Sequence, residues 1–143
     1  MNLTLAPGLL EQIVQHAQSG MPRETCGLIV GPGGGGGPGG REPSATRFIP
    51  ITNRLASATE YDMEPAELIA ALRSLRTSGE SLLAICHSHP RGPAAPSPRD
   101  IELAWYPEAA HVIVSLASPE TPEVRGFRIL DGEVIEIELR AIV

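Results

Sequence analysis

The 143 residues of this chain are enough for one domain, and 42% of them are hydrophobic, so a packed core can form. The formal net charge of -6 argues against general binding to nucleic acid or to anionic membranes, because both need a basic surface on the protein. The first residues do not resemble a targeting signal, and no apolar run is long enough to span a bilayer. Because the chain has only two cysteines, far apart in the sequence, we expect a reduced, cytoplasmic setting.

The first half of the chain predicts two helices separated by two strands. Residues 7–19 repeat apolar side chains at helical spacing, with Pro7 in the first turn. Short apolar runs at residues 25–31 and 47–51 indicate strands. A second helix is expected at residues 65–78, with a buried face made of Leu68, Ile69, Leu72 and Leu75.

A glycine-rich segment, residues 31–40, connects the two expected strands. It matches no phosphate-binding loop, because no Gly-Lys-Ser/Thr sequence ends it and no helix follows it. We therefore interpret the segment as a flexible connection inside one domain that spans residues 1–143.

The second half of the chain predicts a strand, a short helix and three further strands. The strand is expected at residues 81–87, the helix at 97–106, and the later strands at 111–116, 124–130 and 133–142. Asp131 and Gly132 separate the last two strands and are a strong signal for a two-residue hairpin. The order of these elements implies the α/β fold class, as a single domain with a mixed β-sheet flanked by helices.

The apolar strand at residues 81–87 ends in the first of two histidines, His87 and His89, which lie one residue apart. Because side chains at i and i+2 of a strand share a face, His87 and His89 project together and can share one metal ion. After a proline-rich loop, Ser97 and Asp100 open the next helix in a pattern typical of a helix cap. Capping alone would explain these two residues, but it also places the Asp100 carboxylate near the end of the strand that carries the histidines.

Two histidines and one aspartate would leave one corner of a tetrahedral metal site open. Catalytic zinc has this arrangement, with water as the fourth ligand, whereas a structural zinc site is closed by four protein ligands. Cys86 faces the opposite side of the strand from His87, so it is a poor fourth ligand. Cys26 and Cys86 match no paired metal or redox spacing, and we expect both to be buried free thiols.

The segment HSHPRGPAAPSPRD, residues 87–100, resembles the zinc motif of JAMM (MPN+) metalloproteases, which is H-x-H, seven residues and S-x-x-D. That family also places a glutamate just before a strand that begins near Cys-Gly-Leu, and Glu24 in PRETCGLIVG matches it. Asn53 and the YDMEP segment match family positions less specifically. The chain is most similar to stand-alone prokaryotic members, which implies the three-layer, cytidine-deaminase-like architecture of the MPN domain.

The resemblance implies a zinc peptidase or isopeptidase. One Zn2+ per chain would be bound by His87, His89 and Asp100, with water as the fourth ligand. Glu24 would receive a proton from this water and pass it to the leaving amine, and Ser97 would stabilise the oxyanion of the tetrahedral intermediate. Considered without the family, Glu24 would be interpreted as a solvated acid beside a strand.

The resemblance also implies a substrate, namely a ubiquitin-like or sulfur-carrier protein that is cleaved after its C-terminal Gly-Gly. Nucleic acid and membranes are not expected as partners, and a homodimer is left open. Two alternatives remain, a non-catalytic MPN scaffold and a DNA-repair-associated relative with a similar His-x-His-Pro stretch. We expect Trp105 and Tyr106 to pack or to wall a cleft, and we assign His111 no role in the chemistry.

Overall fold

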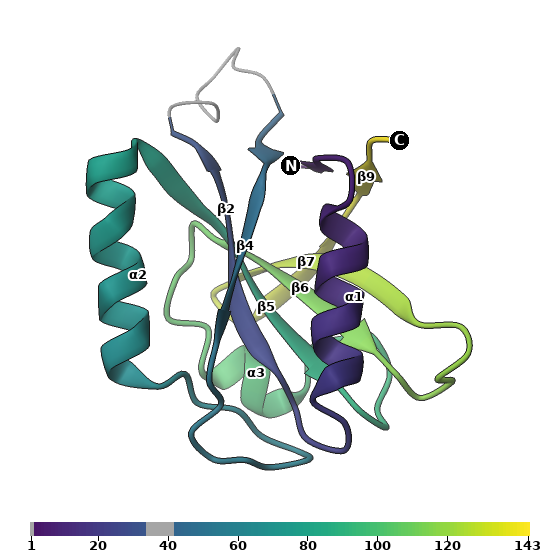
Figure 1. The fold of residues 1–143 in the computed structure, drawn as a ribbon. Helices are drawn as coiled ribbons and strands as arrows, with labels where there is room; N and C mark the ends of the chain where they lie inside the picture. Colours follow the sequence, from purple (N-terminus) through teal and green to yellow (C-terminus); the bar gives the residue numbers. More distant parts are fainter. Residues whose placement is uncertain (1, 34–41) are drawn as a thin grey trace.

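A six-stranded sheet forms the centre of the protein, whose computed structural model describes residues 2–33 and 42–143 (Figure 1). Its strands are β2 (Cys26–Pro32), β4 (Arg47–Ile51), β5 (Glu80–His89), β6 (Ala110–Ser115), β7 (Glu123–Leu130) and β8 (Glu133–Ile137). They lie in the order β4-β2-β5-β6-β7-β8. β5 and β6 run parallel, and the other neighbouring strands of this sheet are antiparallel, so the sheet is mixed as expected.

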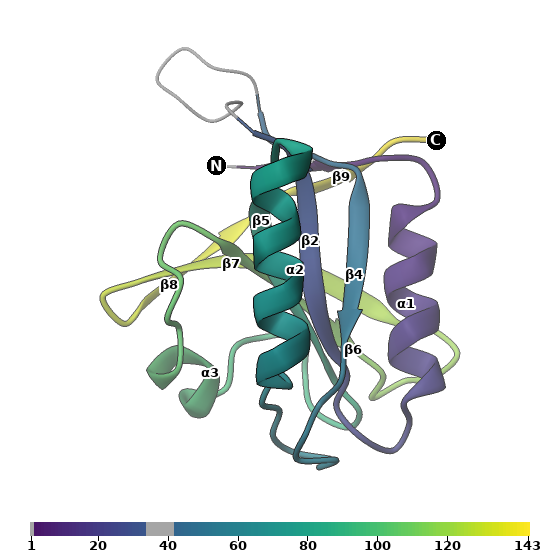
Figure 2. The ribbon, with the colours of Figure 1, turned by 60° about the vertical axis from the view of Figure 1, so that its left-hand side comes forward.

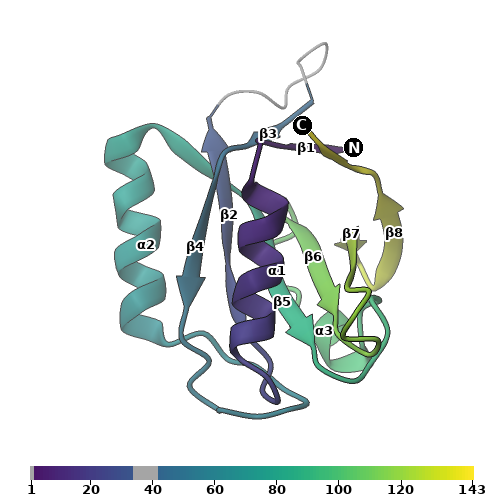
Figure 3. The ribbon, with the colours of Figure 1, turned by 45° about the vertical axis from the view of Figure 1, so that its right-hand side comes forward.

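Three short strands form a second sheet, and two of them were not expected from the sequence. β1 (Leu3–Leu5) pairs in parallel with both β3 (Ser44–Ala45) and β9 (Leu139–Ala141). The expectation of one strand over residues 133–142 is wrong, because the chain leaves the main sheet at Glu138 and β9 pairs with β1 instead. This pairing brings the two ends of the chain close together (Figure 3).

Helices cover both faces of the main sheet, which gives the molecule three layers (Figure 2). α1 (Leu9–Ser19) packs on the face that carries Cys86, and α2 (Pro65–Ser78) packs on the face that carries Ile85. Successive side chains of a strand alternate between faces, so β5 contributes to both cores. The predicted fold class, α/β with a mixed sheet flanked by helices, is confirmed.

Local sequence signals account for several boundaries. α2 begins with Pro65 at its first position and ends at Gly79, whose φ of 76° is a conformation that glycine adopts without steric cost. Asp131 and Gly132 have φ values of 50° and 81°, as the central residues of a type I′ turn require. The predicted hairpin between β7 and β8 is therefore confirmed.

Three local expectations are wrong. Pro7 precedes α1 instead of opening it, because Gly8 occupies the N-cap with a φ of 81°. Ile69 is 50% exposed, since α2 turns Ala71 and Leu75 toward the sheet instead. The third helix, α3 (Pro98–Glu102), ends well before residue 106, and it buries no residue that could hold a longer helix against the core.

The glycine-rich segment at residues 31–40 is described only in part. Gly31 and Pro32 belong to β2, while residues 34–40 lie outside the described residues, so the flexible connection stays a prediction. Among the residues that the structure describes, no helix combines the length and the apolar character needed to cross a membrane.

Candidate metal centre

The carboxyl end of β5 carries both histidines of the motif on one face. His87 is 1% exposed and His89 is 8% exposed, so both imidazoles are withdrawn from bulk water. Ser88 points to the other face, where its hydroxyl oxygen accepts a hydrogen bond of 2.8 Å from the backbone N–H of Thr25. The alternation predicted for residues 87–89 is therefore confirmed, and it follows from the pleat of the strand.

A capping box at the start of α3 orients the Asp100 carboxylate. The Ser97 hydroxyl oxygen accepts a hydrogen bond of 3.1 Å from the backbone N–H of Asp100, and the Asp100 carboxylate accepts one of 2.8 Å from the backbone N–H of Ser97. These reciprocal bonds satisfy two N–H groups that no helix turn can satisfy. The predicted N-cap is confirmed, and the same interaction leaves the carboxylate aimed at the end of β5.

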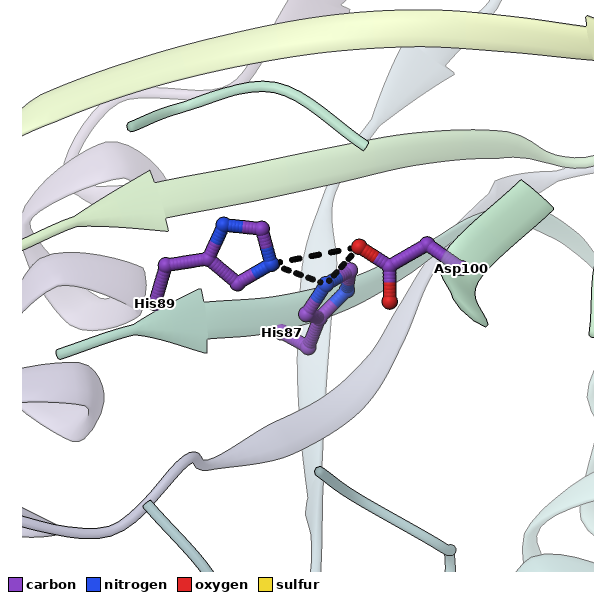
Figure 4. A group of neighbouring side chains, drawn as sticks. All are labelled: His87, His89 and Asp100. Carbon is purple, nitrogen blue, oxygen red and sulfur yellow. Dashed lines mark hydrogen bonds and ion pairs between the residues drawn. The ribbon is translucent and has the colours of Figure 1, made fainter. Parts of the chain in front are cut away.

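The two histidines and Asp100 meet at one point (Figure 4). Nε2 of His87 lies 3.0 Å from Nε2 of His89, and Oδ2 of Asp100 lies 3.1 Å and 3.2 Å from these two nitrogens. Zinc bonds of about 2.0–2.1 Å at tetrahedral angles would separate ligand atoms by about 3.3–3.4 Å. The three atoms thus form a nearly equilateral triangle whose size fits one face of a tetrahedral zinc site.

The protonation of His89 also fits metal binding. A carbonyl oxygen can only accept, so the 2.8 Å contact between Nδ1 of His89 and the Pro93 carbonyl places the ring proton on Nδ1. In the neutral imidazole this leaves the lone pair on Nε2, which is the atom that faces His87 and Asp100. A histidine that binds a metal through one ring nitrogen usually donates a hydrogen bond from the other, which orients its ring.

Glu24 interacts electrostatically with His89 and Asp100 but is not part of this triangle. It directly precedes β2, and only 6% of its surface is exposed. Burial raises the pKa of the Glu24 carboxyl to about 7, while the charge on His89 lowers this pKa and the charge on Asp100 raises it. Glu24 is therefore not the solvated acid that its sequence surroundings alone would suggest, because the fold buries it within electrostatic range of the centre.

Asn53 holds the surroundings of Glu24 in place. Its side-chain amide donates hydrogen bonds to the backbone carbonyls of Glu24 and Glu60, and its side-chain oxygen accepts from the backbone N–H groups of Leu55 and Asp62. These four bonds use both donor hydrogens and both acceptor sites of the amide. In the sequence, Asn53 matched a position of the JAMM family only weakly. No local sequence pattern predicts its four hydrogen-bond partners.

An apolar cavity of about 270 Å³ adjoins the centre on the side of Asp100. Trp105 and Tyr106 line it, so the prediction that they wall a cleft is confirmed, although they follow α3 instead of lying within it. Arg99 of α3 forms an ion pair of 3.5 Å with Glu60 at this cavity. The other apolar residues of its lining are Met63, Leu68, Ile85 and Leu103.

His111 borders the same cavity, a position that sequence reasoning missed. It lies on β6 opposite Ile85, is 4% exposed, and has no hydrogen-bond partner for either ring nitrogen among residues 2–33 and 42–143. Burial, with a smaller contribution from the charge on His87, lowers the pKa of His111 to about 4, although the charge on Asp100 acts in the opposite direction. The parallel register of β5 and β6 places His111 beside the cavity. This register is set by the tertiary structure, so the sequence could not have predicted the position of His111.

The two cysteines are buried free thiols, as expected from the sequence. Cys26 pairs with His87 across β2 and β5, and its thiol lies 3.3 Å from the Ile51 carbonyl. Burial, together with the charge on Glu24, raises the pKa of the Cys26 thiol to about 12, and burial also raises the pKa of the Cys86 thiol. Both thiols are therefore protonated at neutral pH, and neither belongs to the triangle of ligand atoms.

Comparison with known proteins adds relatives of named activity. A family model described as prokaryotic homologs of the JAB domain matches residues 6–130. The CysO-cysteine peptidase of Mycobacterium tuberculosis is 36% identical over 134 residues, which cover 94% of this chain and 87% of the relative. A probable TtuB-protein conjugate cleaving protease of Thermus thermophilus is 37% identical over 131 residues, covering 91% of this chain and 78% of that protein.

Solved structures share the fold over nearly the whole chain. A solution structure of a protein from Desulfitobacterium hafniense is 33% identical and superposes with a TM-score of 0.85, covering 98% of this chain and 92% of that one. A structure described as JAMM, a metalloprotease-like zinc site in the proteasome and signalosome, superposes with a TM-score of 0.56 at 20% identity. It covers 97% of this chain and 98% of its own, and at this identity the likeness concerns the fold alone.

Proposed function

Because the chain belongs to the prokaryotic homologs of the JAB domain, the JAMM family, we propose that it is a zinc-dependent peptidase. Its substrate is a sulfur-carrier or ubiquitin-like protein, and the bond it hydrolyses is the amide that follows the C-terminal Gly-Gly. Residues 1–143 form the catalytic domain. The observation that carries the proposal is the triangle of ligand atoms from His87, His89 and Asp100.

These three residues are the proposed zinc ligands. Two imidazole nitrogens and one carboxylate oxygen suit zinc, and as three protein ligands they leave a position open for chemistry. When bound, zinc supplies a water nucleophile at neutral pH and polarises the carbonyl that is attacked. Asp100 reaches the centre because the helix cap holds its carboxylate there, so ligand placement depends on the start of α3.

Glu24 is the proposed general acid and base. A group that accepts a proton and later donates it works best when its pKa lies near the operating pH. Burial brings the pKa of Glu24 to about 7, so its carboxyl can take the proton of the attacking water and deliver it to the leaving amine. Its backbone is held by the N–H that donates to the Ser57 carbonyl at 2.8 Å and by the carbonyl that accepts from Asn53.

Ser97 is proposed to stabilise the oxyanion of the tetrahedral intermediate. Its hydroxyl oxygen accepts from the backbone N–H of Asp100, which leaves the hydroxyl hydrogen free to donate elsewhere. A preorganised donor aimed at developing negative charge stabilises the transition state more than the ground state. The cap and the catalytic role are compatible because they use different parts of one hydroxyl group.

The names of the relatives support the substrate class. One relative is a peptidase named for CysO-cysteine, and another is named for cleaving TtuB-protein conjugates. We propose that the present chain acts on a carrier of the same kind. A Gly-Gly terminus fits a buried centre, because glycine lets the extended backbone approach the ligands without side-chain clashes.

The proposal is tested with a carrier protein whose Gly-Gly terminus is joined to cysteine or to a short peptide. The zinc-loaded protein should release the cysteine or peptide, and mass spectrometry should place the cut after the second glycine. Glu24→Gln should abolish turnover while zinc content, measured by atomic emission, stays at one ion per chain.

A chelator should also stop the reaction, and added zinc should restore it. A carrier that stays intact in the presence of bound zinc would contradict the peptidase proposal and favour a non-catalytic scaffold. Tight binding to DNA at physiological salt would instead favour the DNA-repair-associated alternative.

A further inference from the structure

The two histidines of the centre differ in how their rings are held. His89 donates from Nδ1 to the Pro93 carbonyl, which fixes both its tautomer and its ring orientation. His87 has no such bond, because its Nδ1 is buried and lacks a hydrogen-bond partner among the residues that the structure describes. Rotation of an imidazole about χ2 is a soft motion, so another contact must restrain the His87 ring.

The ring of Tyr61 supplies this contact. It stacks on the His87 imidazole with the ring centroids 4.6 Å apart and the ring planes 25° from parallel. Stacking occupies the face of the imidazole, whereas the Nε2 lone pair lies in the plane of the ring. The phenol ring can therefore restrain the tilt of His87 without blocking the lone pair that points toward His89 and Asp100.

The backbone around Tyr61 is itself held firmly. Asn53 bonds to the carbonyl of the preceding residue, Glu60, at 3.0 Å and to the N–H of the following residue, Asp62, at 3.0 Å. The Arg54 N–H also donates to the Asp62 carbonyl at 3.0 Å. The residues on both sides of Tyr61 are therefore held by hydrogen bonds, which restrain the backbone position from which the Tyr61 side chain extends.

We propose that Tyr61 is a positioning residue that orients the His87 imidazole toward the bound metal by stacking on its face. The inference rests on the proposed zinc site. The stack of Tyr61 restrains the His87 ring, as the hydrogen bond from Nδ1 to the Pro93 carbonyl restrains the His89 ring. The electron-rich face of Tyr61 also favours an imidazole made more positive by metal binding, as in a cation–π contact.

The test measures zinc affinity by competition with a chromophoric chelator at fixed pH, without any peptide substrate. Tyr61→Leu removes the stack and should weaken zinc binding about 3- to 10-fold, the range expected for one aromatic contact. Tyr61→Phe keeps the ring and should bind zinc within about twofold of the wild type. Tyr106→Leu is the matched control, because Tyr106 lines the same cavity but has no ring contact with a proposed ligand in the described structure.

A second measurement separates positioning from a loss of folding. The absorption spectrum of the cobalt-loaded protein should change in Tyr61→Leu and stay unchanged in Tyr61→Phe, since it reports the geometry of the ligands. If Tyr61→Leu lowers the melting temperature of the metal-free protein, Tyr61→Met replaces it in both measurements. Methionine fills the space with a flexible side chain but cannot stack as an aromatic ring does.

Three outcomes would overturn the inference: Tyr61→Leu binds zinc as tightly as the wild type, Tyr106→Leu loses as much affinity, or Tyr61→Phe loses as much as Tyr61→Leu. None of these readouts uses peptide cleavage. A protein that binds zinc through a Tyr61-dependent site but cleaves no carrier would refute the proposed function and leave this inference standing.

Discussion

The side-chain amide of Asn53 donates a hydrogen bond of 3.1 Å to the backbone carbonyl of Glu24. The same amide group donates to the carbonyl of Glu60, one residue before the tyrosine that stacks on His87. One side chain therefore connects the proposed proton carrier with the support of a proposed metal ligand. Asn53 contributes no atom to the triangle of ligand atoms, so we attribute its effect to the positions of the residues it bonds.

Asn53→Ala should lower both stability and turnover. It leaves four backbone groups without their partner, and we expect a loss of about 2–3 kcal/mol in the free energy of unfolding. kcat should fall by about tenfold or more, because Glu24 loses its anchor. Urea unfolding and carrier cleavage measure the two effects. Asn2→Ala is the control, since the side chain of Asn2 accepts a single hydrogen bond within the described part of the chain, from the N–H of Glu138, and its loss should leave kcat unchanged.

Glu24→Gln should stabilise the metal-free protein at neutral pH. Burial raises the pKa of Glu24 from 4.5 to about 7. Between these pH values the folded protein keeps a proton that the unfolded chain has lost, so the free energy of unfolding falls as pH rises through this window. The fall is at most about 3 kcal/mol, and less where water screens the carboxyl.

Urea unfolding of the wild type and of Glu24→Gln, in the presence of a chelator, checks this prediction. The two proteins should differ little at pH 4 and most above pH 7. Equal pH dependence of the two would show that the Glu24 carboxyl keeps its ordinary pKa in the folded protein.

Ser97→Ala should affect both α3 and catalysis. Loss of the N-cap should cost about 1 kcal/mol of stability, and a less firmly held Asp100 should weaken zinc binding. Loss of the hydroxyl donor should lower kcat by a further factor of about 100 or more if Ser97 stabilises the oxyanion. Ser97→Thr keeps both the cap and the donor and should retain most of the activity. Zinc titration and carrier cleavage, measured together, distinguish capping from catalysis.

His111→Phe should make the metal-free protein more resistant to acid. Burial lowers the pKa of His111 from 6.5 to about 4, so the unfolded chain takes up a proton in this window before the folded protein does. The free energy of unfolding contributed by this group is therefore lost as pH falls from 6.5 to about 4, by about 2–3 kcal/mol. Phenylalanine cannot titrate, so unfolding followed between pH 7 and pH 4 should show a shallower decline. A decline as steep as that of the wild type would contradict the prediction.

Removal of metal should lower the melting temperature of the wild type and leave Asp100→Asn unaffected. A ligand present at 100 times its dissociation constant stabilises the folded state by about 2.7 kcal/mol. Asparagine can still accept the hydrogen bond from the Ser97 N–H, so this variant keeps its cap while losing the charge that zinc prefers. Scanning calorimetry with zinc and with a chelator would measure both proteins. An equal shift in both would place the metal elsewhere.

Short-range patterns in the sequence determined much of the site. Two-residue periodicity placed His87 and His89 on one face of β5, and the capping box between Ser97 and Asp100 set the start of α3. Asp131 and Gly132 determined the hairpin for the same reason, because each of these features depends on residues a few positions apart. The family resemblance added Glu24, whose own surroundings in the sequence suggest only a surface acid.

Tertiary structure alone decided how distant segments meet. The sequence did not predict that Tyr61 stacks on His87, that Asn53 bonds to Glu24, or that His111 lies buried beside the site. Nor did it predict β1, which pairs with β9 from the other end of the chain. These contacts join residues that are far apart along the chain, and they form only after the sheet has set the register of its strands. Local propensity carries no information about such a register, so only the folded structure could reveal it.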